Sequence, residues 1–103
     1  ALSSAASDVY KRQDDKMIVI RDVAPAAPVH VLMIPKAHTE NIITAEPELL
    51  LYMFGKVKEL AEKLGVNEKG FRIVANTGDD GGQTVKHLHI HLLGGKALGW
   101  PPC

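Results

Sequence analysis

Histidine and aliphatic residues alternate in one short segment near the C-terminus: His87, Leu88, His89, Ile90, His91 and Leu92. Strict alternation over this length is typical of a β-strand with one polar face and one apolar face. Imidazole is the side chain whose unperturbed pKa lies nearest to neutrality, so three on one face offer nucleophilic, acid–base and metal-binding capacity. We therefore expect the functional site along this strand.

Three interpretations of the histidine segment compete. A purely structural role is the weakest, because each imidazole brings polar atoms that need hydrogen-bond partners. The second is a metal site, since ligands at alternate strand positions can converge on one ion, with Asp79 or Asp80 as the nearest further ligands. In the third, one imidazole is a nucleophile that its neighbours orient.

A turn-forming stretch with three glycines, Asn76–Thr84, precedes the histidines. Such a loop can bring bare backbone N–H groups close to a phosphate or another anion. Gln83 and Thr84 add side-chain donors directly before the strand. Asp79 and Asp80 suit a solvent-exposed turn better than an inward-facing metal site. Loop and histidines together favour phosphate-ester or phosphoramidate chemistry.

The segment Gly81–Gly95, which reads GGQTVKHLHIHLLGG, resembles the signature of the histidine-triad (HIT) superfamily. Its Gly-Gly-Gln start, its Leu-Gly-Gly end and the sequence Gly99–Pro102 resemble the Hint branch, the nucleoside phosphoramidases. The similarity continues through Pro28–His38 and Asp14–Met17. It therefore covers residues 14–102, nearly all of the chain apart from the N-terminus.

The resemblance implies a hydrolase that cleaves the P–N bond of purine nucleoside 5′-phosphoramidates, such as adenosine phosphoramidate or AMP-lysine, without metal or cofactor. It implies that His89 is the nucleophile and forms a covalent nucleotidyl-histidine, which water then cleaves. The second ring nitrogen of His89 would donate to the backbone carbonyl of His87. His91 would bind a phosphoryl oxygen and stabilise the charge that grows in the transition state.

The resemblance also implies residues around the phosphate. His38 follows the second predicted strand, and a proton relay between it and Thr84 would serve the departing amine. Most members of the family carry Ser where this chain has Thr84. Asn76 and the loop at Gly82 would hold phosphoryl oxygens, and Gln83 would lie along the side of the bridging oxygen or amine.

The nucleoside half of the ligand has its own expected contacts. Asp22 would accept hydrogen bonds from the ribose hydroxyls, with a turn aspartate that caps backbone amides as the alternative. Ile20 and Val23 would form an apolar slot for the base, although the family usually has an aromatic residue where Ile20 stands. Trp100 would either pack on its own subunit or reach the active site of a dimer partner. His30, in the middle of a strand, is expected to be structural.

Two further functions stay open at this point. One is dinucleoside polyphosphate hydrolysis by another HIT branch, against which the Leu-Gly-Gly and Trp-Pro-Pro sequences argue. The other is a non-enzymatic nucleotide-binding or scaffold protein. The retention of four histidines together with Asn76 and Gln83 argues against that function and for competent chemistry.

Composition narrows the class of protein. A chain of 103 residues is one domain, and 12 basic against 12 acidic residues leave no positive field for a nucleic-acid polymer. The single cysteine, Cys103, excludes an intramolecular disulfide framework and fits the cytoplasm. No apolar run approaches the ~20 residues of a membrane span. The expected partners are a purine mononucleotide and a second copy of the chain.

The N-terminus suggests a foreign segment. Asp8–Gln13 is what the DNA sequence GAT GTG TAT AAG AGA CAG encodes, which resembles a transposase adapter of sequencing libraries. We therefore expect residues 1–13 to be non-native or disordered, and residues 14–103 to form a single, N-terminally truncated HIT domain. An ordinary disordered tail is the alternative.

Hydrophobic periodicity predicts strands at residues 16–21, 29–34, 70–75 and 87–93 and a helix at residues 44–64. Thr44 would cap the helix, Gly65 would end it, and close packing would account for Gly55 inside it. This order predicts an α+β fold: a HIT-like antiparallel sheet of about four to five strands with one long helix. Its exposed edge and free face predict a two-fold dimer, which the resemblance also implies.

Overall fold

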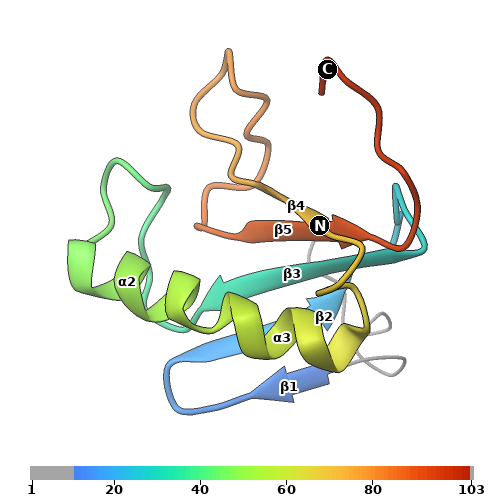
Figure 1. Cartoon of the computed structure of the whole chain (residues 1–103). Helices are drawn as coiled ribbons and strands as arrows, with labels where there is room; N and C mark the ends of the chain where they lie inside the picture. The colour runs from blue at the N-terminus through green and yellow to red at the C-terminus, as the bar shows by residue number, and fades with distance from the viewer. Residues whose placement is uncertain (1–10, 103) are drawn as a thin grey trace.

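A computed structural model of the chain describes residues 11–102 (Figure 1). Most of the segment predicted to be foreign, residues 1–10, lies outside the described residues, as does Cys103. Residues 11–13, however, form strand β1 (Lys11–Gln13) and pair with Ile18–Ile20. Strand pairing uses main-chain groups, which nearly every residue type provides. The sheet thus includes three residues expected to lie outside the domain, and the adapter origin of residues 1–13 stays a prediction.

Five antiparallel strands form one sheet in the order β1-β2-β3-β5-β4, as the α+β prediction requires. After β1 the strands are β2 (Met17–Arg21), β3 (Val29–Pro35), β4 (Phe71–Val74) and β5 (Ile90–Gly94). Strand β3 therefore lies between β2 and β5, and it brings the end of β2 close to the histidines of β5. Strand β4 is one edge of the sheet.

Two helices, α2 (Pro47–Gly55) and α3 (Val57–Leu64), lie across one face of the sheet (Figure 1). The predicted helix start at Thr44 is wrong. Proline at the first helical position, Pro47, sets the start because its fixed φ suits a helix and it has no N–H to leave unpaired. The hydroxyl of Thr44 instead accepts a hydrogen bond from the backbone N–H of Asn41 (3.2 Å) in the preceding turn.

The helical segment breaks at Lys56, which the sequence did not predict. The N–H of Lys56 donates to the carbonyl of Met53 (3.1 Å), a tighter spacing than that of an α-helix. Close packing does not explain Gly55, since a Cβ there would meet nothing within 4 Å; as a poor helix former it ends α2. Gly65 ends α3 with a left-handed φ of 74°, as predicted. Within residues 11–102, no helix has the length and apolar character to cross a bilayer.

The core lies between the helices and the sheet, where alternate strand residues face α2 and α3. Its most deeply buried members are Val31, Met33, Met53, Leu60, Ile90 and Leu92. The buried positions of Leu88, Ile90 and Leu92 confirm the predicted alternation. Strand β5, however, begins three residues later than predicted, because the N–H of Leu88 bonds to the carbonyl of Thr39 (2.8 Å) in a loop.

A carboxylate ties the β1–β2 turn to α2. Asp14 accepts hydrogen bonds from the backbone N–H groups of Lys16 and Met17 (both 2.8 Å) and from the hydroxyl of Tyr52. The Tyr52 bond is the main cause that lowers the pKa of Asp14 to about 2, and it raises the pKa of Tyr52 to about 12. The turn is therefore fixed to the helix by a charged acceptor at neutral pH.

Candidate active site

A cavity of about 330 Å³ opens beside the histidines of β5, a volume within the range of small-ligand pockets. Most of the residues predicted for phosphate binding and catalysis line it. The lining consists of Asp22, Val23, Ala24, Leu32, Asn76, Gly82, Gln83, Thr84, Val85, His89 and His91. The cavity thus brings together residues that are far apart in sequence. They come from the β2–β3 turn, the glycine loop and β5.

His89 has one ring nitrogen fixed by the main chain. Its Nδ1 lies 2.8 Å from the carbonyl oxygen of His87, as the resemblance implied. A carbonyl oxygen only accepts hydrogen bonds, so Nδ1 carries the proton. In the neutral ring Nε2 then keeps its lone pair, which is the form that a nucleophile requires.

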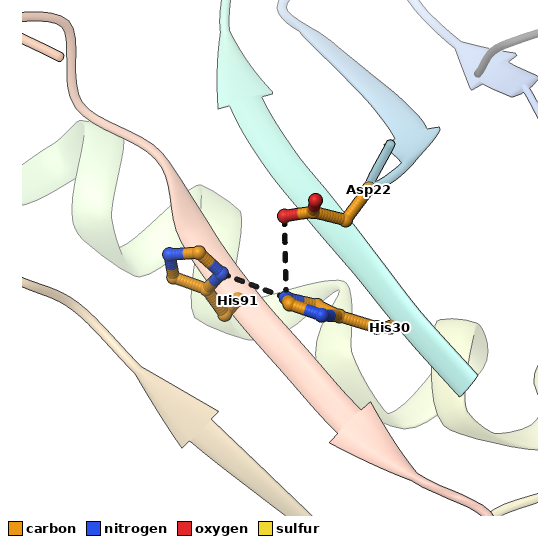
Figure 2. A group of neighbouring side chains, drawn as sticks. All are labelled: Asp22, His30 and His91. Atoms are coloured by element: carbon orange, nitrogen blue, oxygen red, sulfur yellow. Dashed lines mark hydrogen bonds and ion pairs between the residues drawn. The ribbon is translucent and has the colours of Figure 1, made fainter. Parts of the chain in front are cut away.

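His91 is oriented by His30, which lies between it and Asp22 (Figure 2). The backbone N–H of Ala26 donates to Nδ1 of His30 (3.0 Å), so this nitrogen cannot also carry a proton. The proton of neutral His30 is therefore on Nε2, 2.9 Å from Nδ1 of His91. His91 accepts there and keeps its own proton on Nε2, where it can donate to a ligand.

Burial favours the neutral form of the two linked histidines. It is the main cause that lowers the pKa of His30 and of His91, although the nearby carboxylate of Asp22 opposes it. One oxygen of Asp22 lies 3.4 Å from Nε2 of His30, and the other accepts from the N–H of Ala24 (2.8 Å). Asp22 is therefore the turn aspartate weighed as the alternative, and it lines the cavity as well.

Asp22, His30 and His91 are close enough to be tested as a metal site, since their ligand atoms all lie within 4.8 Å of one another. A metal-bound histidine normally donates its other N–H to an acceptor. His30 does the opposite, because its other nitrogen accepts from Ala26. Binding a cation through Nε2 would require losing that proton or that backbone bond. The donor set of these residues does not fit a metal.

His87 and His38 form a separate pair. Nε2 of His87 donates to the carbonyl of Pro35 (2.9 Å), and its Nδ1 lies 3.3 Å from Nδ1 of His38. Neither ring lines the cavity. Among the described residues no hydrogen bond joins His38 to Thr84, which lines the cavity without it. His87 contributes to the site through its carbonyl oxygen, to which His89 is bound.

The glycine loop is held mainly by its own atoms. The N–H of Gly82 donates to the carbonyl of Asp79, and Nδ2 of Asn76 donates to the carbonyl of Gly81 (2.7 Å). Gly78 and Gly82 have φ values of +72° and +77°, which glycine adopts without strain. The loop therefore has a defined shape, and part of the backbone N–H set expected to be bare is used to make it.

Gln83 has no spare hydrogen-bonding capacity in its side chain. Its oxygen accepts from the N–H of Gly78 (3.0 Å) and from Nδ2 of Asn41 (3.2 Å). Its nitrogen donates to the carbonyls of Glu40 (2.7 Å) and Val85 (3.1 Å). An amide offers two donors and two acceptor positions, and all four are occupied. The amide is therefore bonded to groups of the protein, and not directed at the bridging oxygen or amine of a ligand as expected.

The expected base slot is partly displaced. Ile20 is buried and does not line the cavity, whereas Leu32, its partner across the sheet, does. Val23 is half exposed at the cavity wall. Trp100 is 82% exposed, so it does not pack on its own subunit, and its contact with a dimer partner stays a prediction.

Residues 5–98 match the model of the HIT domain. The chain belongs to the HIT family. It is 54% identical over 93 residues to an uncharacterized HIT-like protein of Synechococcus elongatus. The aligned region covers 87% of this chain and 81% of that protein. Among solved structures it is similar to a HIT family hydrolase from Legionella pneumophila Philadelphia 1 and to a histidine triad nucleotide-binding protein from Candida albicans. The first has a TM-score of 0.85 and 41% identity, covering 89% of this chain and 85% of that one. The second has a TM-score of 0.76 and 30% identity, covering 89% and 73%.

The HIT histidine segment was identified from the sequence, but two neighbours of the site were not. His30 was expected to be structural, and it is 61 residues from the ring that it orients. Asn41 was not singled out, although its side chain is buried and bonded to Gln83. His30 could have been identified from its place on β3, the strand that pairs with the histidine strand β5. The order of the strands in the sheet, however, has to be known first.

Proposed function

We propose that this HIT protein is a nucleotide hydrolase that cleaves the P–N bond of purine nucleoside 5′-phosphoramidates, the chemistry of the Hint branch. The single observation that carries the proposal is the direction of the hydrogen bonds on the two histidines of the cavity. His89 keeps an unprotonated Nε2 for attack, and His91 presents a protonated Nε2 for donation. One ring is therefore a nucleophile and the other is a donor for phosphoryl oxygen.

The reaction has two displacements. Nε2 of His89 forms a bond to the α-phosphorus while the P–N bond breaks, and the amine leaves with a proton. Water then attacks the same phosphorus, breaks the bond to His89 and gives the nucleoside monophosphate. Thr84 lines the cavity, and we propose that its hydroxyl donates a proton to the departing amine and takes one in turn from a solvent water molecule. The proposal leaves His38 out of this relay, because His38 bonds to His87 and does not line the cavity.

The nucleoside would lie along the turn after β2. Asp22 retains acceptor capacity for ribose hydroxyls, since a carboxylate offers about four lone-pair positions. Val23 and Leu32 supply apolar surface for the base, and Asn76 and Gly82 lie on the phosphate side. This placement is supported by one continuous cavity that contains all of these residues.

The test is to mix the protein with adenosine 5′-phosphoramidate in excess chelator. We expect release of AMP, and mass spectrometry should find a transient adenylyl group on the peptide that contains His89. His89→Asn should abolish both, because it removes the nucleophile while keeping a polar side chain of similar size.

Other outcomes would assign the protein differently. Activity lost in chelator and restored by zinc would indicate a metallohydrolase. Turnover of diadenosine polyphosphate in preference to the phosphoramidate would indicate another HIT branch. Binding of AMP without turnover of either would indicate a nucleotide-binding protein.

We further propose that the chain works as a two-fold homodimer. Strand β4 is an edge of the sheet, and Phe71 on it is 37% exposed. An edge strand presents unpaired main-chain groups that a second copy can pair with. Such pairing would join two sheets and place the C-terminal segment with Trp100 near the partner.

A further inference from the structure

The side chain of Gln83 connects two segments that no strand pairing joins. Its oxygen and nitrogen are bonded to Asn41 and Glu40 in the turn after β3, and to Gly78 and Val85 in the glycine loop. Most of the loop is exposed, including Gly78–Gly82. Gln83 therefore fixes the glycine loop to the turn after β3.

Asn41 makes this connection rigid. It is only 8% exposed, although it is polar. Its side-chain oxygen accepts from the N–H groups of Ile43 (2.9 Å) and Thr44 (3.3 Å), which leaves Nδ2 directed at Gln83. Thr44 in turn bonds to the hydroxyl of Thr39 (2.8 Å), whose carbonyl accepts from Leu88 next to the catalytic histidine. The turn that holds Gln83 is thus also bonded to the histidine segment.

We propose that Gln83 and Asn41 are positioning residues that set the height of the glycine loop over the phosphate, and that the Gln83 amide does not touch the substrate. This inference rests on the proposed function. A ligand contact through the amide would require breaking one of its four internal bonds, which would leave one of the protein groups bonded to Gln83 without its partner. Loop and histidines are held by the same turn, so their spacing is fixed before a ligand arrives.

The test uses two uncharged variants of the full chain. Gln83→Met keeps the length of the side chain and removes all four bonds. Asn41→Ser keeps an oxygen for the turn but is too short to reach Gln83, and Asn41 does not line the cavity. Because a misplacement of about 1 Å can cost 100-fold in rate, we expect kcat/KM to fall about 10- to 100-fold in Gln83→Met and less in Asn41→Ser. The double variant should be no worse than Gln83→Met, since both changes break the same connection.

Two readouts separate positioning from contact. In the ligand-free protein, amide exchange at Gly78 should accelerate at least about tenfold in Gln83→Met, which removes the acceptor of the Gly78 N–H. It should accelerate less in Asn41→Ser, which keeps the acceptor but removes the bond that holds the Gln83 oxygen in place. The affinity for AMP should fall, whereas the affinity for adenosine should not change. Asn67→Ser, an exposed asparagine in the turn after α3, is the matched control and should match the wild type.

The inference is overturned if Asn41→Ser leaves Gly78 exchange and kcat/KM unchanged while Gln83→Met loses activity, since Gln83 would then act on the substrate directly. Should Gln83→Met not fold, Asn41→Ser decides alone. A wild type that hydrolyses no phosphoramidate refutes the proposed function. Unchanged exchange at Gly78 refutes the positioning role, whatever the activity of the wild type.

Discussion

Both ring nitrogens of His30 are occupied by neighbours inside the protein, which makes it the residue that determines the proton position of His91. It receives a hydrogen bond from Ala26 and passes one to His91. A charged His30 would place two N–H groups against each other at Ala26. The site therefore tolerates only the neutral form of this ring.

The stability of the protein should depend on pH for this reason. The folded-state pKa of His30 is lowered by burial, so the unfolded chain binds more protons than the folded chain below about pH 6.5. We expect the free energy of unfolding to fall as the pH is lowered from 7 to 5, and His30→Gln should reduce that fall. Urea unfolding at several pH values measures it. An equal fall in both proteins would mean that His30 is not the titrating group.

At the scale of elements, the regular patterns of the sequence predicted strands and helices well but did not predict which distant segments contact each other. Alternation identified the buried aliphatic residues of β5, and periodicity identified most of the helical segment. The helix start was missed because Thr44 and Pro47 both favour a start, and only the turn geometry decides between them. The pairs His30–His91 and His38–His87 were missed because they join residues 61 and 49 positions apart.

The contribution of β5 to the core can be measured with Leu92→Ala. Leu92 is fully buried between the sheet and the helices, so the substitution should lower the free energy of unfolding by about 2–5 kcal/mol. Leu51→Ala, at a side chain that is 75% exposed, should change it by no more than about 0.5 kcal/mol. Chemical denaturation compares the two, and similar losses would contradict the assigned core.

At the scale of the whole molecule, the two faces of the sheet have separate tasks. Helices α2 and α3 cover one face and make the core, while the other carries His30, His91 and the small cluster of Ile20, Leu32 and Ile34. Strand β4 ends this arrangement without a neighbour beyond it among the described residues. A second copy is the partner that would continue the sheet.

The dimer proposal predicts a concentration-dependent association through β4. Phe71→Lys places a charge at this edge, a feature with which natural edge strands prevent pairing. Sedimentation velocity should show a particle with twice the mass of the single chain for the wild type, and a shift toward the mass of the single chain for the variant. A wild type that stays a single chain at millimolar concentration would contradict the proposal.

The donor that orients His30 belongs to the peptide backbone, and this has a consequence for how the protein can evolve. Every amino acid except proline provides an N–H at position 26. The side chain at position 26 can therefore change to any residue except proline without altering which nitrogen of His91 carries the proton. Most mutations at position 26 therefore leave the proton position of His91 unchanged, because the hydrogen bond that sets it is donated by the main chain.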